Sequence, residues 1–151
     1  MEWKPTSGPS SNQVATLQLC IGRTCLIFQM IHADKIPRSL RDFLSDSNYK
    51  FVGVGVQSDV DKLKGDYKTC VVNVVDVWDL AADKYGSNEV NKSVGLMKLA
   101  EVVLGCGEIE KPKNVTLSDW DQYHLSRAQI QYACVDAYVS FKIGEKLFKD
   151  D

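Results

Sequence analysis

The stretch Gln131-Tyr132-Ala133-Cys134-Val135-Asp136-Ala137-Tyr138 lies in a segment, 126–149, that the sequence predicts to be one long helix. This segment has no proline and one glycine, Gly144, and Ser126 stands where an N-cap belongs. At about 100° per residue, its apolar side chains fall into two rows on nearly opposite sides. The first row is Ile130, Cys134, Ala137, Phe141, Gly144 and Phe148; the second is Tyr132, Val139 and Ile143. We therefore expect neighbouring elements to cover this helix on two sides.

Asp136 is the unusual residue of the helix, because it lies in the second apolar row, one turn after Tyr132. A carboxylate on a covered face costs several kcal/mol unless it is paired, hydrogen-bonded or bound to a metal. Two interpretations follow from the helix alone. Asp136 is either a paired structural residue or a metal ligand with a tyrosine hydroxyl one turn away.

Composition describes an ordinary globular chain. Its 151 residues predict a single domain, 1–151, with 44% apolar and 25% charged residues. The net charge of −2 argues against broad electrostatic binding of nucleic acid. No signal peptide or apolar run of membrane-span length is visible, which predicts an intracellular protein of the nucleus or cytoplasm without membrane contact. The five cysteines include no C-x-x-C pair and are expected to be reduced.

The first half of the chain has the patterns of strands. Residues 13–21 alternate in polarity, Gly22-Arg23 is a two-residue turn, and 24–30 is a second strand, so the pair predicts a hairpin. Residues 49–56 are nearly continuously apolar, as in a strand buried on both faces. A junction to a helix follows, with Ser58 or Asp59 as its cap.

Further elements complete an α/β pattern. We expect a helix at 37–44, a short buried strand at 71–77 and helices at 78–85 and 94–104, followed by a charged loop at 108–114. Together these predict an α/β fold whose mixed sheet has an antiparallel hairpin on one side and parallel strands on the other.

Three acids stand out by position. Glu2 precedes the first loop, Asp59 follows a buried strand, where α/β sheets place their sites, and Asp136 lies on the covered face of the last helix. Each has an ordinary alternative: Glu2 as a solvated terminal residue, Asp59 as a helix cap and Asp136 as a paired acid. Acids from three distant segments, with Tyr132 beside the last, would together suit hard divalent cations.

Three motifs resemble the DEDD superfamily of 3′–5′ exonucleases, tyrosine subclass, and most closely the Werner-type exonuclease domain of plants. Residues 2–5, E-W-K-P, look like the tail of the first motif, Asp-x-Glu-Trp-x-Pro. Residues 53–59, G-V-G-V-Q-S-D, with Leu63, look like the second. Residues 117–120 (L-S-D-W), Leu125-Ser126, Gln129 and 132–137 (Y-A-C-V-D-A) look like the third, Tyr-x-x-x-Asp.

The resemblance implies a ribonuclease-H-like fold and a hydrolase that removes nucleoside 5′-monophosphates from the 3′ end of DNA or RNA with two Mg²⁺ or Mn²⁺ ions. Glu2, Asp59 and Asp136 would be the metal ligands, and Tyr132 would orient or help deprotonate the attacking water. Trp3 and Gln57 would lie near the substrate, and Trp3 could equally pack in the core.

The chain departs from the family pattern at the first motif, because the acid that opens it would precede Met1. Most of the first, central strand would be missing with it, so we expect impaired metal binding and activity. Either the natural protein is longer, or the exposed sheet edges pair between protomers in a homo-oligomer. The alternative functions are a non-catalytic exonuclease-like domain that binds nucleic acid or a protein partner, and a structural domain whose acids are only caps.

Overall fold

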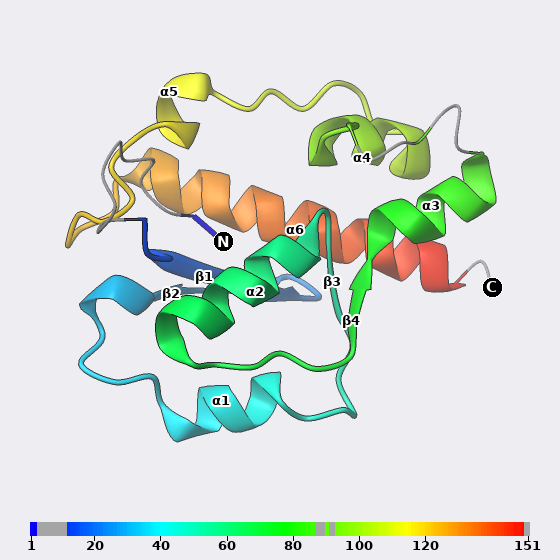
Figure 1. Cartoon of the computed structure of the whole chain (residues 1–151). Helices are drawn as coiled ribbons and strands as arrows, with labels where there is room; N and C mark the ends of the chain where they lie inside the picture. Colours follow the sequence, from blue (N-terminus) through cyan, green and yellow to red (C-terminus); the bar gives the residue numbers. More distant parts are fainter. Residues whose placement is uncertain (3–11, 87–89, 91–92, 150–151) are drawn as a thin grey trace.

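The computed structural model describes residues 1–2, 12–86, 90 and 93–149. Along the chain, its elements are β1 (Thr16–Ile21), β2 (Thr24–Gln29), the 3₁₀ helix η1 (Met30–His32), α1 (Arg38–Leu44), β3 (Phe51–Gly53), α2 (Val56–Tyr67), β4 (Val74–Asp76), α3 (Val77–Tyr85), α4 (Leu96–Leu104), α5 (Lys113–Thr116) and α6 (Arg127–Lys149). The fold is α/β, as the sequence predicts, and α6 runs through the middle of it (Figure 1).

The hairpin of β1 and β2 has the expected antiparallel register, with Cys20 opposite Cys25. Its turn begins at Gly22, whose φ of 59° lies in the left-handed region that glycine enters without strain. Leu17 is buried, whereas Ile21 at the tip is 73% exposed. The hairpin therefore has one end in the core and one end in solvent.

All five cysteines of the chain are free thiols.

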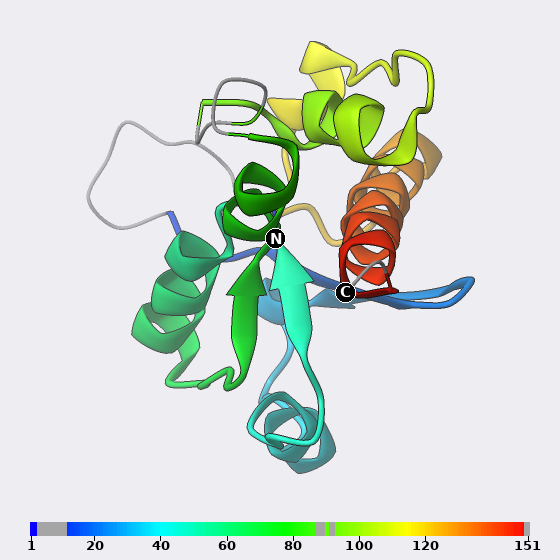
Figure 2. The ribbon, with the colours of Figure 1, turned by 90° about the vertical axis from the view of Figure 1, so that its right-hand side faces the viewer.

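The second pair of strands is parallel, with Phe51 opposite Val74 and Gly53 opposite Asp76. In Figure 2, α6 lies beside β3 on one side of the pair and α2 lies beside β4 on the other. Among the described residues no strand joins this pair to the hairpin. An isolated antiparallel bridge between Glu2 and Thr16 lies beside β1.

Two predictions around β3 are wrong. The strand does not extend over 49–56, because Gly55 takes a φ of 64° and becomes the N-cap residue of α2. Neither Ser58 nor Asp59 caps the helix: Asp59 lies in its first turn, and the Ser58 hydroxyl donates to the Gly55 carbonyl at 2.8 Å. Gly55 also lies so close to the Trp78 ring that a Cβ at this position would be 3.3 Å from it.

The helix α6 confirms the expected range and packs against β1, β2, β3, α3 and α4. Its second apolar row is the more deeply buried, since Val139 and Ile143 belong to the core shared with α3 and α4. Ile130, assigned to the first row, is 45% exposed. At Gly144 the helix comes so close to β3 that a Cβ would lie 2.8 Å from Val52 Cγ2.

The start of α6 is fixed by a capping box, in which Ser126 and Gln129 bind each other. The Gln129 amide N–H donates to Ser126 Oγ at 3.2 Å, and the Ser126 N–H donates to Gln129 Oε1 at 2.9 Å. The Gln129 side-chain amide also donates to Ser118 Oγ and to the Asp119 carbonyl. This buried glutamine therefore ties the segment before α6 to the first turn of the helix.

Candidate active site

Tyr132 and Asp136 lie one turn apart on α6, as the sequence predicts. Tyr132 is 7% exposed, and its ring packs against Trp120 with a centroid separation of 5.8 Å. The Thr116 hydroxyl donates to the Tyr132 hydroxyl at 2.9 Å. The phenol is thus held at both ends, by a buried indole and by a hydrogen bond from α5.

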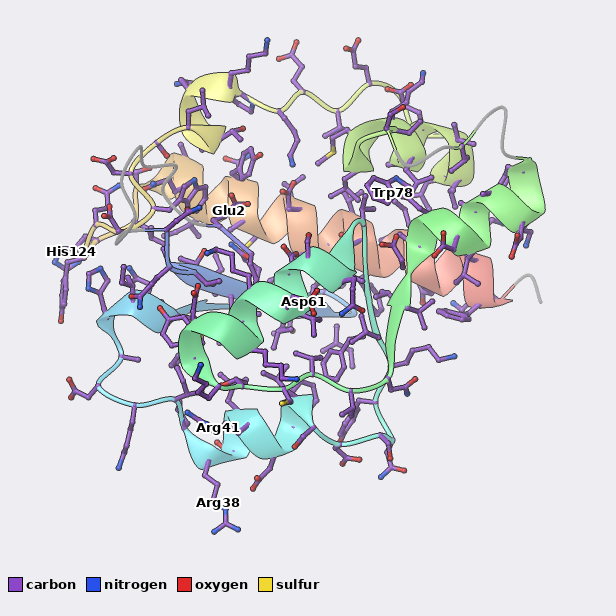
Figure 3. All side chains as sticks on the ribbon, in the orientation of Figure 1. Glu2, Arg38, Arg41, Asp61, Trp78 and His124 are labelled. Carbon is purple, nitrogen blue, oxygen red and sulfur yellow. The ribbon has the colours of Figure 1, made fainter. Side chains whose placement is uncertain are left out.

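Glu2 is brought to α6 by its backbone. Its N–H donates to the Thr16 carbonyl at 3.1 Å, and its own carbonyl accepts from the N–H groups of Ala15 and Thr16. The bridge holds Glu2 beside β1, and its side chain is labelled in Figure 3. Burial is the main cause that raises the pKa of the Glu2 carboxyl to about 7.

The pKa of Glu2 is also shifted by the charged groups near it. The amino group of Met1 and the ammonium of Lys111 oppose the rise of its pKa, whereas the carboxylates of Asp136 and Asp59 add to it. The three acids predicted from the sequence are therefore near enough to interact electrostatically, although they come from separate segments of the chain.

Asp59 enters this cluster from the first turn of α2, which the left-handed backbone of Gly55 directs away from β3. The Met1 ammonium lies 3.7 Å from Asp59 Oδ2. Burial raises the pKa of Asp59, and the positive Met1 amino group works in the opposite direction. The carboxylate is therefore desolvated and paired with a single nearby cation.

The two carboxylate oxygens of Asp136 have different surroundings. Lys111 Nζ lies 2.7 Å from Oδ2, whereas Oδ1 is buried and accepts no hydrogen bond from the described residues. Burial raises the pKa of Asp136 despite the opposing Lys111 charge. An unpartnered buried carboxylate oxygen is costly, and a bound cation would satisfy it.

Lys111 and Thr116 are site residues that the sequence analysis missed. Lys111 stands between α4 and α5, in the charged segment 108–114 that was predicted to be a loop; in the structure, α5 begins within it. Its Nζ lies 4.8 Å from the centroid of the Tyr132 ring as well as beside Asp136. A lysine in a charged loop is ordinary, so no local signal marked it.

Two further residues were predicted near the substrate. Trp3 lies outside the described residues. Gln57 is exposed in the first turn of α2, and its side-chain amide donates to Asp61 Oδ1 at 3.0 Å. Gln57 thus lies two residues before Asp59, and its side chain forms a hydrogen bond within α2, to Asp61.

A cavity of about 270 Å³ adjoins Tyr132 and Asp136, between α6 and the segment that joins α4 to α5. Its lining includes Met97, Lys111, Val115, Tyr132, Val135 and Asp136. The cavity thus has an apolar wall beside the ion pair of Lys111 and Asp136.

The donor set fits hard divalent cations in chemistry, because three partly buried carboxylates supply oxygen atoms and Asp136 Oδ1 is unpartnered among the described residues. Throughout the described ranges, no three His, Cys, Asp or Glu side chains lie close enough together to hold a metal ion. Two protein cations, the Met1 ammonium and Lys111, instead lie against Asp59 and Asp136. The carboxylates are gathered but not closed around a common point.

The arrangement of strands and helices is that of the ribonuclease-H-like class. The crystal structure of RNase D from Escherichia coli superimposes with a TM-score of 0.79 over 99% of this chain and 37% of that one, at 19% identity. Identity at that level supports the fold alone. None of the helices in the described part is both long enough and apolar enough to cross a bilayer.

The family follows from the sequence comparisons. Residues 1–150 match the family model described as 3′-5′ exonuclease, and the chain belongs to that family. It is 37% identical to a 3′-5′ exonuclease of Arabidopsis thaliana, over 99% of this chain and 51% of the relative. It is 32% identical to the bifunctional 3′-5′ exonuclease/ATP-dependent helicase WRN of Mus musculus, over 97% of this chain and 10% of that protein. The chain thus spans about half the length of the Arabidopsis relative and about a tenth of the Mus musculus protein.

The EXD2 exonuclease domain is a relative of known structure. The crystal structure of the EXD2 exonuclease domain soaked in Mn is 30% identical, with a TM-score of 0.51, and the match covers 97% of this chain and 73% of that one.

Proposed function

We propose that this chain is a metal-dependent 3′-5′ exonuclease that hydrolyses the last phosphodiester bond at the 3′ end of DNA or RNA and releases a nucleoside 5′-monophosphate. The observation that supports the proposal most strongly is that Asp136, one turn from Tyr132 on α6, has a buried carboxylate oxygen without a hydrogen-bond partner in the described chain, while its charge and that of Asp59 both act on Glu2. Membership of the exonuclease family supports the same reaction.

Glu2, Asp59 and Asp136 would hold the Mg²⁺ or Mn²⁺ ions. Two divalent cations, when bound to such a site, would stabilise the attacking and leaving oxygens of the phosphoryl displacement. The protein supplies buried carboxylates whose mutual repulsion is relieved when cations enter. Because the net charge is only −2 and not basic, the substrate would be gripped at its end and not along a broad surface.

Tyr132 would position the attacking water. Its hydroxyl is fixed by Thr116 and its ring by Trp120, so the phenol is held in one place before substrate arrives. Trp3 and Gln57 are proposed to contact the terminal nucleotides. Gln57 is suited to this by its exposed position in the first turn of α2, two residues from Asp59.

A second function, a non-catalytic domain that binds nucleic acid or a protein through the same surface, is favoured by one observation. The carboxylate of Asp136 is already paired with Lys111, a cation of the protein. A domain that had lost its metals would be expected to neutralise its acids in this way.

One experiment separates the two. A single strand and a 3′-recessed duplex, each labelled at the 5′ end, are incubated with the protein and Mn²⁺, in parallel with the Asp136→Asn and Asp42→Asn variants. We expect a ladder that shortens from the 3′ end with the natural protein and with Asp42→Asn, whose carboxylate pairs with Arg38 far from the site. The ladder should disappear with Asp136→Asn. Absence of any ladder from folded natural protein would favour the non-catalytic domain.

A further inference from the structure

Lys111 is the group of the described site that the proposed reaction does not use. Its Nζ lies 2.7 Å from Asp136 Oδ2 and 4.8 Å from the centroid of the Tyr132 ring, so it stands between the two residues that the reaction needs most. The ammonium occupies one oxygen of a carboxylate that is proposed to bind metal.

Lys111 contacts only one of the two carboxylate oxygens of Asp136. Oδ1 is buried and accepts no hydrogen bond within the described chain, so Lys111 satisfies only half of the carboxylate. Lys111 also acts on Glu2, whose charge it offsets together with the Met1 amino group. The lysine thus performs, for two of the three acids, the neutralisation that a cation would perform.

A divalent cation bound to Asp136 and the Lys111 ammonium would repel each other. A cation that satisfies Oδ1 would stand on the same carboxylate as the ammonium, in a partly desolvated site where charges are weakly screened. The Asp136 side chain is 21% exposed and that of Lys111 is 33% exposed. Lys111 therefore has a path to solvent, whereas Asp136 is fixed on α6.

Lys111 lies in the connection between α4 and α5. Residues 105–112 form neither helix nor strand and join α4 to α5. The same segment lines the 270 Å³ cavity beside Tyr132 and Asp136, through Ile109, Lys111 and Pro112. A shift of Lys111 would therefore change the wall of the cavity next to the reacting groups.

We propose that Lys111 is a place-holding counter-ion: it neutralises Asp136 in the metal-free protein, and a divalent cation displaces it from the carboxylate. This inference rests on the proposed metal site. It adds that metal affinity is reduced by the fraction of molecules in which Lys111 holds Asp136, and that metal binding moves the segment 105–112.

The first test follows Lys111 in the 151-residue chain with Mn²⁺ as the only ligand. Lysines are modified with an amine-directed reagent, with and without Mn²⁺, and the extent at each position is read by mass spectrometry. We expect the modification of Lys111 to rise several-fold with Mn²⁺, because the ammonium leaves its ion pair. Lys113, exposed at the start of α5, should not change. Unchanged or reduced modification of Lys111 while Mn²⁺ binds would overturn the displacement.

The second test measures Mn²⁺ affinity by calorimetry for Lys111→Met and for the matched control Lys113→Met. Displacement predicts that Lys111→Met binds about tenfold more tightly, whereas the control binds as the natural protein does. Equal or weaker binding by folded Lys111→Met would reject the place-holding role and leave the metal site standing. Failure of Mn²⁺ to bind any of the three proteins would instead reject the metal site, and the inference with it.

Discussion

The Thr116 hydroxyl and the Tyr132 hydroxyl are 2.9 Å apart, which links the short helix α5 to the turn of α6 that carries Asp136. Trp120 packs on the Tyr132 ring from the same stretch of chain and donates its indole N–H to the Thr116 carbonyl at 3.2 Å. The three side chains form one unit. The position of the phenol thus depends on residues that precede α6.

Tyr132→Phe tests the role of the hydroxyl in the proposed exonuclease. We expect the rate of 3′-end cleavage to fall by about 10²-fold, since a positioned hydroxyl contributes in this range. Mn²⁺ affinity should be unchanged, because the carboxylates remain. Thr116→Val keeps the phenol and removes its partner, so a smaller loss is expected. Full activity of Tyr132→Phe in a single-turnover assay would exclude the positioning role.

The stability of the metal-free protein should depend on pH through Glu2. Burial holds the pKa of this carboxyl at about 7, against an ordinary value of 4.5, so between these pH values the folded protein binds more protons than the unfolded chain. The free energy of unfolding should therefore fall as pH rises from about 4.5 to about 7 and then level off. Asp59 and Asp136, whose pKa values are also raised by burial, act in the same direction.

Denaturant titrations in the presence of a chelator would measure this slope. Glu2→Gln should flatten the pH dependence, because the amide cannot ionise. The exposed Glu108→Gln variant serves as the control and should retain the natural slope. An unchanged slope in Glu2→Gln would mean that the other two acids alone produce it.

Gly144→Ala should destabilise the fold. A Cβ at this position would lie 2.8 Å from Val52 Cγ2, so α6 and β3 would have to separate, at a cost of about 1–3 kcal/mol. Gly65→Ala on α2 is the matched control, since its Cβ would meet no atom within 4 Å. There the better helix propensity of alanine should add about 0.5–1 kcal/mol. Equal stability of the two variants in a urea titration would contradict the close packing at Gly144.

Gln129→Glu should cost about 2–3 kcal/mol, because a carboxylate would replace the amide that donates to Ser118 and to the Asp119 carbonyl. Two oxygens would then face each other in a buried site. Gln131→Glu, two residues along the same helix and exposed, should change the melting temperature little. If both variants melt alike, the buried network does not stabilise the start of α6.

The elements most visible in the sequence were those governed by local rules. The hairpin was predicted from alternation and a Gly-X turn, and α6 from an unbroken pattern that begins at Ser126. Strand β3 is predicted too long because apolar residues continue to Val56, whereas Gly55 takes a left-handed backbone conformation next to the Trp78 ring. Tertiary packing decided that boundary, and the local pattern could not.

The same division applies to the candidate site. Asp136 was singled out because an acid on an apolar row is anomalous, and Tyr132 because it precedes that acid by one turn. Thr116 and Lys111 have no such signal. Their importance lies in contacts across 16 and 25 positions of sequence, which only the folded chain brings together.

Helix α6 touches both pairs of strands, which are not hydrogen-bonded to each other in the described chain. It packs on the hairpin through one part of its surface and on β3 through Gly144. A local loosening of this helix would therefore release both sheets together, so its central amides should exchange with solvent only through global unfolding. The turn that holds Tyr132 and Asp136 thus belongs to the part of the molecule that we expect to open last.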